Sequence, residues 1–255
     1  MELLSRISTH KPLEWRAYCN RCASYHTLSF EEALPEAQLL LKKLEQQKSI
    51  DIFGPDASDK ALATARLFGE ERGKMFGVLK CRTTKNQVEY LYAFSGQYAG
   101  RWQVNGWCPP LFDVDCFYAL NDPIEKEIKA IGANLAEQND PIKQRTLHQK
   151  RKTLSQHLMK EIHQLYQVHN FHRDSTSLES VFHEFSGGMP TGTGDCCAPK
   201  LLNQAAIKQL TPISLVEFYF GRENRSETRK HGYCYPPCTD KCAPILGYML
   251  CGASV

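Results

Sequence analysis

Residues 34–48 combine apolar and charged side chains at helical spacing. The apolar positions recur every three to four residues: Leu34, Ala37, Leu41 and Leu44. Charged residues fall mostly on the opposite side of this helix. Pro35 is compatible only with the first turn of a helix, so the predicted helix begins close to it. Residues 61–67 predict a second, short helix, whereas residues 1–30 show no regular pattern.

Two neighbouring segments, 73–82 and 87–96, contain β-branched and aromatic residues. The polar residues 83–86 separate them, which is the pattern of two antiparallel strands joined by a turn. We therefore expect a β-hairpin over residues 73–96. Its aromatic side chains are expected to form one face of a core, and the alternative is a platform on which RNA bases stack.

Two signals for the start of a helix occur between residues 122 and 170. In each, an aspartate precedes a proline: Asp122 with Pro123, and Asp140 with Pro141. Aspartate caps helix N-termini, and proline fits the first helical position. Isoleucines and leucines at helical spacing follow both signals. We expect either two helices or one kinked helix in this section.

Residues 186–255 predict a glycine-rich turn followed by a helix, a strand and a second helix. The turn covers residues 186–194, and the first helix starts at Asp195 as its capping residue. Apolar, β-branched and aromatic residues between 212 and 221 indicate a strand. The closing helix is expected to begin at Pro244.

Together these elements predict an α+β protein with a mixed β-sheet, packed helices and a basic helical arm. Three segments are expected. Residues 1–121 form an N-terminal α/β part that contains the hairpin, and residues 122–175 form the arm. Residues 176–255 form a cysteine-rich C-terminal α/β part that completes the same fold.

Composition excludes several classes of protein. The chain has 255 residues, and 31 Lys plus Arg against 28 Asp plus Glu leave a net charge of +3. A strongly basic chain would by itself indicate nucleic-acid binding, and this net charge is too small for that. The hydrophobic fraction of 42% is typical of a globular chain and excludes general disorder. The uncharged run 242–255 is shorter than the roughly 20 apolar residues of a membrane span. No secretory signal pattern is visible, so we expect a cytoplasmic protein that does not enter the membrane.

Positive charge is concentrated in residues 141–160, which contain basic but no acidic side chains. Several cations on one helix can displace counterions from an RNA backbone. The alternatives are a solvated helix face and contact with a partner helix. The candidate RNA-binding residues are Lys143, Arg145, Lys150, Arg151 and Lys152.

The chain contains eleven cysteines, and six of them fall within residues 196–251. Disulfides are rare in the cytoplasm, so these thiols are expected to be metal ligands, core residues or reactive groups. Zinc takes about four thiolate or imidazole ligands, and helix N-termini stabilise thiolates. The predicted cofactor is therefore zinc; the alternatives are buried structural thiols and a catalytic thiol. The candidate ligands are Cys196, Cys197, His231, Cys238 and Cys242.

A lone C-x-x-C, formed by Cys19 and Cys22 and followed by His26, has the form of half a metal site. No second C-x-x-C completes it. We expect an incidental pair of thiols there, with a zinc half-site as the alternative.

Pro237 and Cys238, with Cys242 following, approach the P-C-x-x-C signature of zinc-dependent nucleobase deaminases. The second cysteine comes one residue late. The signature also requires a glutamate two residues after the first ligand, and Ala198 and Pro199 stand at those places. Glu217, on the following predicted strand, would serve only through an unforeseen geometry.

Several motifs resemble the extra N-terminal region of a subset of bacterial pseudouridine synthases of the RluA type. They are GTGDCCAPKLL at 192–202, VEFYFG at 216–221 and RKHGYCYPPCTDKCAPILGYML at 229–250. Residues 73–79, 92–96 and 108–113 resemble the same region in the same order, so the resemblance covers about residues 70–253. It implies RNA modification as the context. The partners implied are RNA, ribosomal or transfer, and a pseudouridine synthase catalytic domain.

The catalytic aspartate of that family lies in an R-L-D motif of the catalytic domain, and the chain contains no R-L-D. The related H-R-D at residues 172–174 lies in a polar stretch that predicts a loop. We therefore expect no catalytic residues, and a non-catalytic accessory domain that assists RNA binding. The alternatives are a zinc-dependent hydrolase distantly like the deaminases and a structural or protein-interaction module.

Overall fold

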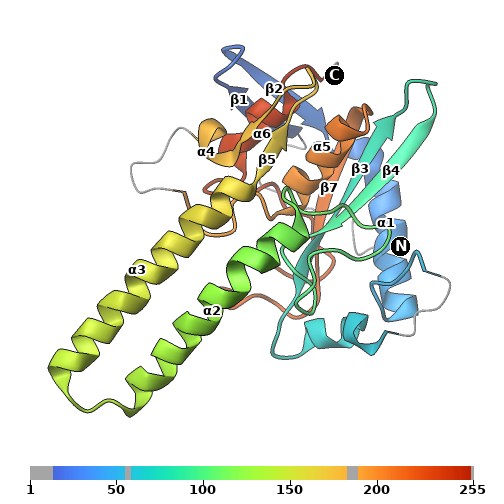
Figure 1. Ribbon diagram of the computed structural model, residues 1–255. Coiled ribbons are helices and arrows are strands. Elements are labelled where there is room, and N and C mark those ends of the chain that lie inside the picture. The colour runs from blue at the N-terminus through green and yellow to red at the C-terminus, as the bar shows by residue number, and fades with distance from the viewer. Residues whose placement is uncertain (1–13, 55–58, 183–188, 254–255) are drawn as a thin grey trace.

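A computed structural model describes residues 14–54, 59–182 and 189–253 of the chain. Five strands form a mixed sheet in the order β1–β2–β7–β3–β4 (Figure 1). Neighbouring strands are antiparallel except β2 and β7, which are parallel. The strands are β1 (Glu14–Cys19), β2 (Ser24–Ser29), β3 (Lys74–Arg82), β4 (Val88–Phe94) and β7 (Thr211–Phe220). The described chain is thus α+β with a mixed sheet, as the sequence predicted.

The hairpin predicted at residues 73–96 is present as β3 and β4. Asn86 adopts a left-handed conformation in the turn between them. The strand predicted at 212–221 is present as β7 and pairs with β3 along its whole length. Because β7 lies between the two hairpins, residues from both ends of the chain complete one sheet.

The expectation of an irregular segment over residues 1–30 was wrong for residues 14–29, and residues 1–13 lie outside the described residues. β1 and β2 form a second hairpin with six paired positions. Trp15, Ala17 and Cys19 are buried, while Arg16 and Tyr18 between them are exposed. This alternation is the half-buried strand pattern, but it is too short to stand out beside the polar residues that follow it.

Helices cover both faces of the sheet. α1 (Leu34–Gln47) buries its apolar side against Phe76, Val78 and Phe218 on one face. α5 (Cys197–Ile207) and α6 (Ala243–Leu250) pack on the other face, where Leu79 and Leu215 lie. These two helices begin at the cysteines of the C-terminal part, so their packing decides where the thiols meet.

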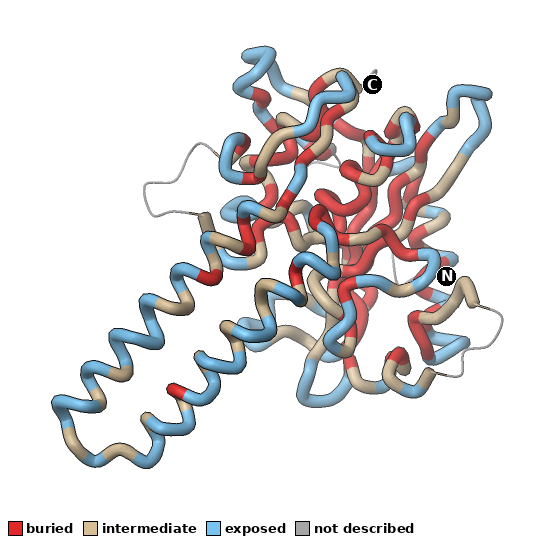
Figure 2. Tube along the Cα trace, viewed as in Figure 1, coloured by how far each residue is buried: buried red, intermediate tan, exposed pale blue. Residues whose placement is uncertain are grey.

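α2 (Val114–Glu137) and α3 (Pro141–Leu165) lie side by side and project from the body as a long hairpin, the arm (Figure 1). Most of the arm is exposed or half-buried (Figure 2). Phe117, Leu158 and Ile162, at its base, join the core of the body. The arm therefore rests on the body only at one end.

Several element boundaries differ from the sequence prediction. α2 begins nine residues earlier than expected, because Asp113 rather than Asp122 caps it, and Pro123 lies inside the helix. Asp140 does cap α3, as predicted. Residues 60–68 form 3₁₀ turns, Lys60–Leu62 and Thr64–Phe68, instead of the expected α-helix. Another 3₁₀ turn, Glu31–Ala33, leads into α1.

The remaining elements follow the arm. β5 (Gln167–His169) and β6 (Ser175–Ser177) form a small hairpin, and α4 (Leu178–Val181) follows it. Residues 172–174 lie in the turn of this hairpin, outside any helix or strand, as the sequence predicted for H-R-D. No helix in the described ranges has both the length and the apolar character needed to cross a membrane.

Candidate metal centre

Three of the predicted ligands meet between α5 and α6. Cys196, Cys238 and Cys242 each offer a sulfur atom, and the three atoms lie within 4.8 Å of one another. The sulfurs of Cys196 and Cys238 are 3.7 Å apart. Zinc–sulfur bonds of about 2.3 Å in a tetrahedral site place sulfurs about 3.8 Å apart. The group, called here the cysteine triad, thus has the spacing of a metal site and could hold a metal ion.

Helix starts position the triad. Cys196 is the N-cap residue of α5 and Cys242 that of α6. The backbone N–H groups of Cys242 and Ala243 donate to the carbonyl oxygen of Cys238, at 3.3 and 3.0 Å, and this turn returns Cys238 toward Cys242. Helix N-termini present free N–H groups and a positive dipole end, which favour thiolate over thiol.

The thiols of the triad affect one another's ionisation. The hydrogen bond from Cys196 lowers the pKa of Cys238, and the same bond raises the pKa of Cys196. One thiolate is therefore favoured, and further thiolates beside it are opposed by like charge. A bound cation would remove this opposition. Cys242 is buried while Cys196 and Cys238 are half-buried, so the triad is partly open on one side.

Two predicted ligands do not belong to the triad, which corrects the prediction. Cys197 follows Cys196 on the helix, so its side chain points in another direction, and its thiol donates to the Met75 carbonyl oxygen at 3.3 Å. His231 packs against Phe220 on the α1 side of the sheet. Its Nδ1 accepts the backbone N–H of Gly221 at 3.1 Å, and its Nε2 lies 3.3 Å from Glu45.

Glu217 of β7 lies beside the start of α5. Its Oε1 accepts the backbone N–H of Ala198 at 2.6 Å, and the residue is only 3% exposed. Burial raises the pKa of Glu217 to about 7. Sequence reasoning looked for a glutamate near Cys196 along the chain, whereas the sheet supplies one through space.

Two further polar groups hold the start of α5, the buried Lys200 and the half-buried Asp195, and the sequence did not predict the contacts of either. Lys200 is 1% exposed and donates to the carbonyl oxygens of Phe94 and Gly96, at 3.0 and 2.8 Å. Burial lowers the pKa of Lys200 to about 8. Asp195, expected to cap α5, instead accepts a hydrogen bond of 2.7 Å from the Tyr166 hydroxyl. These contacts tie the start of α5 to β4 and to the end of the arm.

The predicted RNA-binding residues lie on α3, and all five are exposed. Two of them form ion pairs with acidic residues. The Nζ atom of Lys150 lies 3.0 Å from a carboxylate oxygen of Glu127 on α2, and that of Lys143 lies 4.0 Å from a carboxylate oxygen of Asp140. Within the part of the chain that the structure describes, Arg145, Arg151 and Lys152 make no ion pair. The arm residues and the triad are therefore two separate features of the molecule.

The thiols of Cys19 and Cys22 do not stand alone. They lie close to His26, and Cys251 from the end of α6 joins them in a second group of ligand atoms within 4.8 Å of one another. The expectation of incidental thiols was based on the missing second C-x-x-C. A cysteine more than 200 residues away along the chain takes its place.

The three motifs at 192–202, 216–221 and 229–250 converge in space. The first contributes Cys196, the second contributes Glu217, and the third contributes Cys238 and Cys242. Motifs that are distant along the chain thus build the surroundings of one candidate metal centre. Comparison with protein-family models, with curated proteins and with solved structures finds no match to this chain.

Proposed function

We propose that this chain is an RNA-binding accessory domain, built around a zinc centre, that assists a pseudouridine synthase. The projecting arm carries the proposal, because it offers an elongated basic helix beyond the body of the domain. A second line of support is the resemblance to the extra region of RluA-type synthases, whose motifs surround the cysteine triad.

The charge of the arm is divided between its two helices. α3 contains six Lys or Arg residues and one Glu, whereas α2 contains five Asp or Glu residues and two Lys. Residues seven apart on a helix lie about 20° apart around its axis. Lys143 and Lys150 therefore share one side, next to α2. Arg145 and Lys152 share another side, which is roughly opposite the stripe of leucines that faces α2.

This division narrows the candidate contacts with RNA. The charge of Lys150 is partly neutralised by Glu127. The unpaired cations Arg145 and Lys152, on the side of α3 that faces away from α2, are therefore expected to contribute most to RNA binding. Arg145 and Lys152 would contact phosphates, which position a nucleic acid without reading its sequence. Lys143, Lys150 and Arg151 would add attraction at longer range.

Zinc is the metal proposed for the triad. Three thiolates match its preference for sulfur ligands, and the sulfur spacing matches a tetrahedral site. The ion would join the starts of α5 and α6, and its binding free energy would add to the stability of the fold. The chain has no R-L-D aspartate, so it should not form pseudouridine by itself.

The test is a salt series of binding isotherms with structured ribosomal or transfer RNA. The variant Arg145→Gln/Lys152→Gln should lower the slope of log affinity against log salt by about 1.4 to 1.8, since two phosphate contacts are lost and each contributes about 0.7 to 0.9. The matched control Lys126→Gln/Lys129→Gln removes two cations from α2 and should leave the slope unchanged. Equal slopes in all three proteins would contradict the proposal and favour a protein-interaction module.

A zinc-dependent hydrolase distantly like the nucleobase deaminases is the second candidate, and the position of Glu217 favours it. Such enzymes use a zinc-bound water and a glutamate that is not a ligand. Glu217 is outside the triad yet close to it, and a carboxyl with a pKa near 7 suits proton transfer. Release of ammonia from cytosine or adenine nucleosides by the zinc-loaded chain, lost in Glu217→Gln, would favour this candidate.

A further inference from the structure

The tip of the β1–β2 hairpin and the residue after α6 bring three thiols and an imidazole together. Cys19, Cys22, His26 and Cys251 each offer one ligand atom, and these atoms all lie within 4.8 Å of one another. The sulfur of Cys22 is 3.1 Å from Nε2 of His26. We propose that these four residues form a second zinc site, separate from the cysteine triad and structural in role.

The ligand set is chemically complete. Three thiolates and one imidazole fill the four positions of tetrahedral zinc, so no position is left for water or substrate. That distinguishes this group from the triad, which supplies three ligands. A disulfide would use only two of the three cysteines, and all three are free thiols in the structure. Zinc accounts for all four side chains.

The hairpin arranges three of the ligands locally. Cys19 ends β1, and its partner in the last paired position is Ser24 of β2. Ala23 adopts a left-handed conformation, with φ of 50°, which closes the short turn between the strands. The turn brings the Cys22 sulfur back toward β2, where His26 lies. A C-x-x-C sequence at a tight turn is a frequent way to supply two zinc ligands.

Helix α6 supplies the fourth ligand. Its Gly247 lies against the backbone of Tyr18 so closely that a methyl group there would overlap the Tyr18 carbonyl oxygen. The backbone of Cys251 is held on both sides. Its N–H donates to the backbone carbonyl oxygen of Tyr248 at 3.1 Å, and its own carbonyl oxygen accepts from the N–H of Phe171 at 2.9 Å. The thiol is therefore positioned by contacts that do not depend on a metal.

The proposed site has a defined mechanical role. β2 pairs with β7 at a single position, Ser29 with Ser214, near the base of the hairpin. At the opposite end, no strand among the described residues pairs with the tip on the β2 side. A zinc ion bound to Cys251 would hold the tip against α6. The hairpin would then be fixed at both ends.

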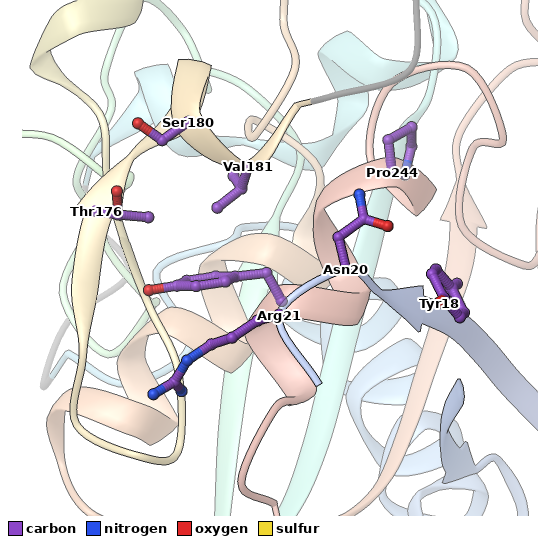
Figure 3. Close-up of a pocket in the computed structure, with 8 residues that line it drawn as sticks. Tyr18, Asn20, Arg21, Thr176, Ser180, Val181 and Pro244 are labelled. Carbon is purple, nitrogen blue, oxygen red and sulfur yellow. The ribbon is translucent and has the colours of Figure 1, made fainter. Parts of the chain in front are cut away.

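The site also borders a pocket of about 360 Å³. Asn20 and Arg21, which lie between the two cysteines of the tip, line one side of it, and Thr176 and Ser180 line another (Figure 3). Arg21 forms an ion pair of 2.7 Å with Asp174. Zinc at the tip would hold this wall of the pocket in place.

The test is the zinc content of the full chain, measured by mass spectrometry of the eluted metal. The wild-type chain should bind two ions. The variant Cys22→Ser/His26→Ala should bind one, and so should Cys238→Ser through loss of the other site. Cys116→Ser, which removes another exposed cysteine, should still bind two. Since the two sites are removed by different variants, failure of this proposal is distinguishable from failure of the triad.

Alkylation of cysteines in the wild-type chain is a second test, and it does not depend on whether the variants fold. Cys22 and Cys116 are both exposed, so iodoacetamide should modify both in the metal-free chain. In the zinc-loaded chain Cys22 should react at least about tenfold more slowly than in the metal-free chain, whereas the rate at Cys116 should be the same in both. Protection that disappears with a chelator supports the site. A Cys22 modification rate that zinc leaves unchanged, or a wild-type zinc content that Cys22→Ser/His26→Ala leaves unchanged, would overturn the proposal.

Discussion

Two buried ionisable side chains next to the triad show how single residues hold the start of α5. Lys200 reaches across to carbonyl oxygens of the β4 end, and Glu217 accepts an N–H from the first turn of the helix. Burial acts against the charged form of both groups. Each is retained in the core because it satisfies backbone groups that would otherwise lack partners.

Lys200→Met should destabilise the protein by about 2 kcal/mol or more, because the buried carbonyl oxygen of Phe94 and the half-buried one of Gly96 lose their donor. Lys208→Met is the matched control. Lys208 is exposed and pairs with Glu89 at 3.0 Å, and surface pairs contribute little, so a change within about 0.5 kcal/mol is expected. Urea unfolding of both variants measures the difference. Similar losses in the two variants would show that the Lys200 contacts are unimportant.

Glu217→Gln should change how stability depends on pH. The folded-state pKa of about 7 lies above the ordinary value of 4.5. The protonated carboxyl is therefore the form favoured by folding, and its contribution is complete below about pH 4.5 and lost as pH rises to about 7. Relative to Glu217→Gln, the wild-type chain should lose up to about 3 kcal/mol over this range. Unfolding free energies at pH 5 and pH 8 test this, and a difference independent of pH would contradict it.

At the scale of elements, two glycines let helices approach strands closely. On β3, Gly77 faces α5, and a methyl group there would lie 2.6 Å from the Cβ of Cys197. On α6, Gly247 faces the backbone of β1. Both contacts position helices that carry cysteines. The positions of the two groups of thiols therefore depend on Gly77 and Gly247. Dense packing leaves no space for the added carbon.

Gly247→Ala should destabilise the protein by about 2 kcal/mol or more, since α6 must move away from β1 to make room. It should also separate Cys251 from the hairpin tip and lower the zinc content. Gly132→Ala on α2 is the control, because the nearest atom lies 3.9 Å away and alanine favours helix. Thermal unfolding should show a higher midpoint for Gly132→Ala and a lower one for Gly247→Ala. An unchanged midpoint in Gly247→Ala would contradict the close packing.

At the scale of the whole molecule, the triad joins segments that are separated by more than forty residues. Cys196 starts a helix on one side of β7, and Cys238 and Cys242 come after the loop that follows this strand. The second group likewise joins the first hairpin to the last helix. Metal ions at these points would act as cross-links of the folded chain.

Cys238→Ser should lower the thermal midpoint of the zinc-loaded chain by about 5 °C or more. A loss of about 2 kcal/mol or more in stability corresponds to that shift in a chain of this size. The same variant should behave like the wild type once both are treated with a chelator. Differential scanning calorimetry measures the midpoints. A Cys238→Ser midpoint equal to that of the zinc-loaded wild type would contradict a bound metal at the triad.

The elements with strong periodic patterns could be predicted from the sequence. The hairpin at 73–96, the strand at 212–221 and the start of α3 at Asp140 follow from local signals, because turns, caps and alternation are properties of neighbouring residues. The start of α2 was missed because Asp113 and Asp122 are both suitable caps. The β1–β2 hairpin was missed because its alternation is short.

The sequence by itself determined the α+β class, the central hairpin, the basic charge of α3 and the clustering of cysteines near helix starts. Only the tertiary structure decided which ligands meet. It turned Cys197 and His231 away from the triad, placed Glu217 beside it, and carried Cys251 to Cys19, Cys22 and His26. The physical reason is that helix and strand patterns depend on neighbouring residues. A metal site requires side chains that are distant along the chain to lie close in space, and the packing of α5 and α6 on the sheet sets the distances between them.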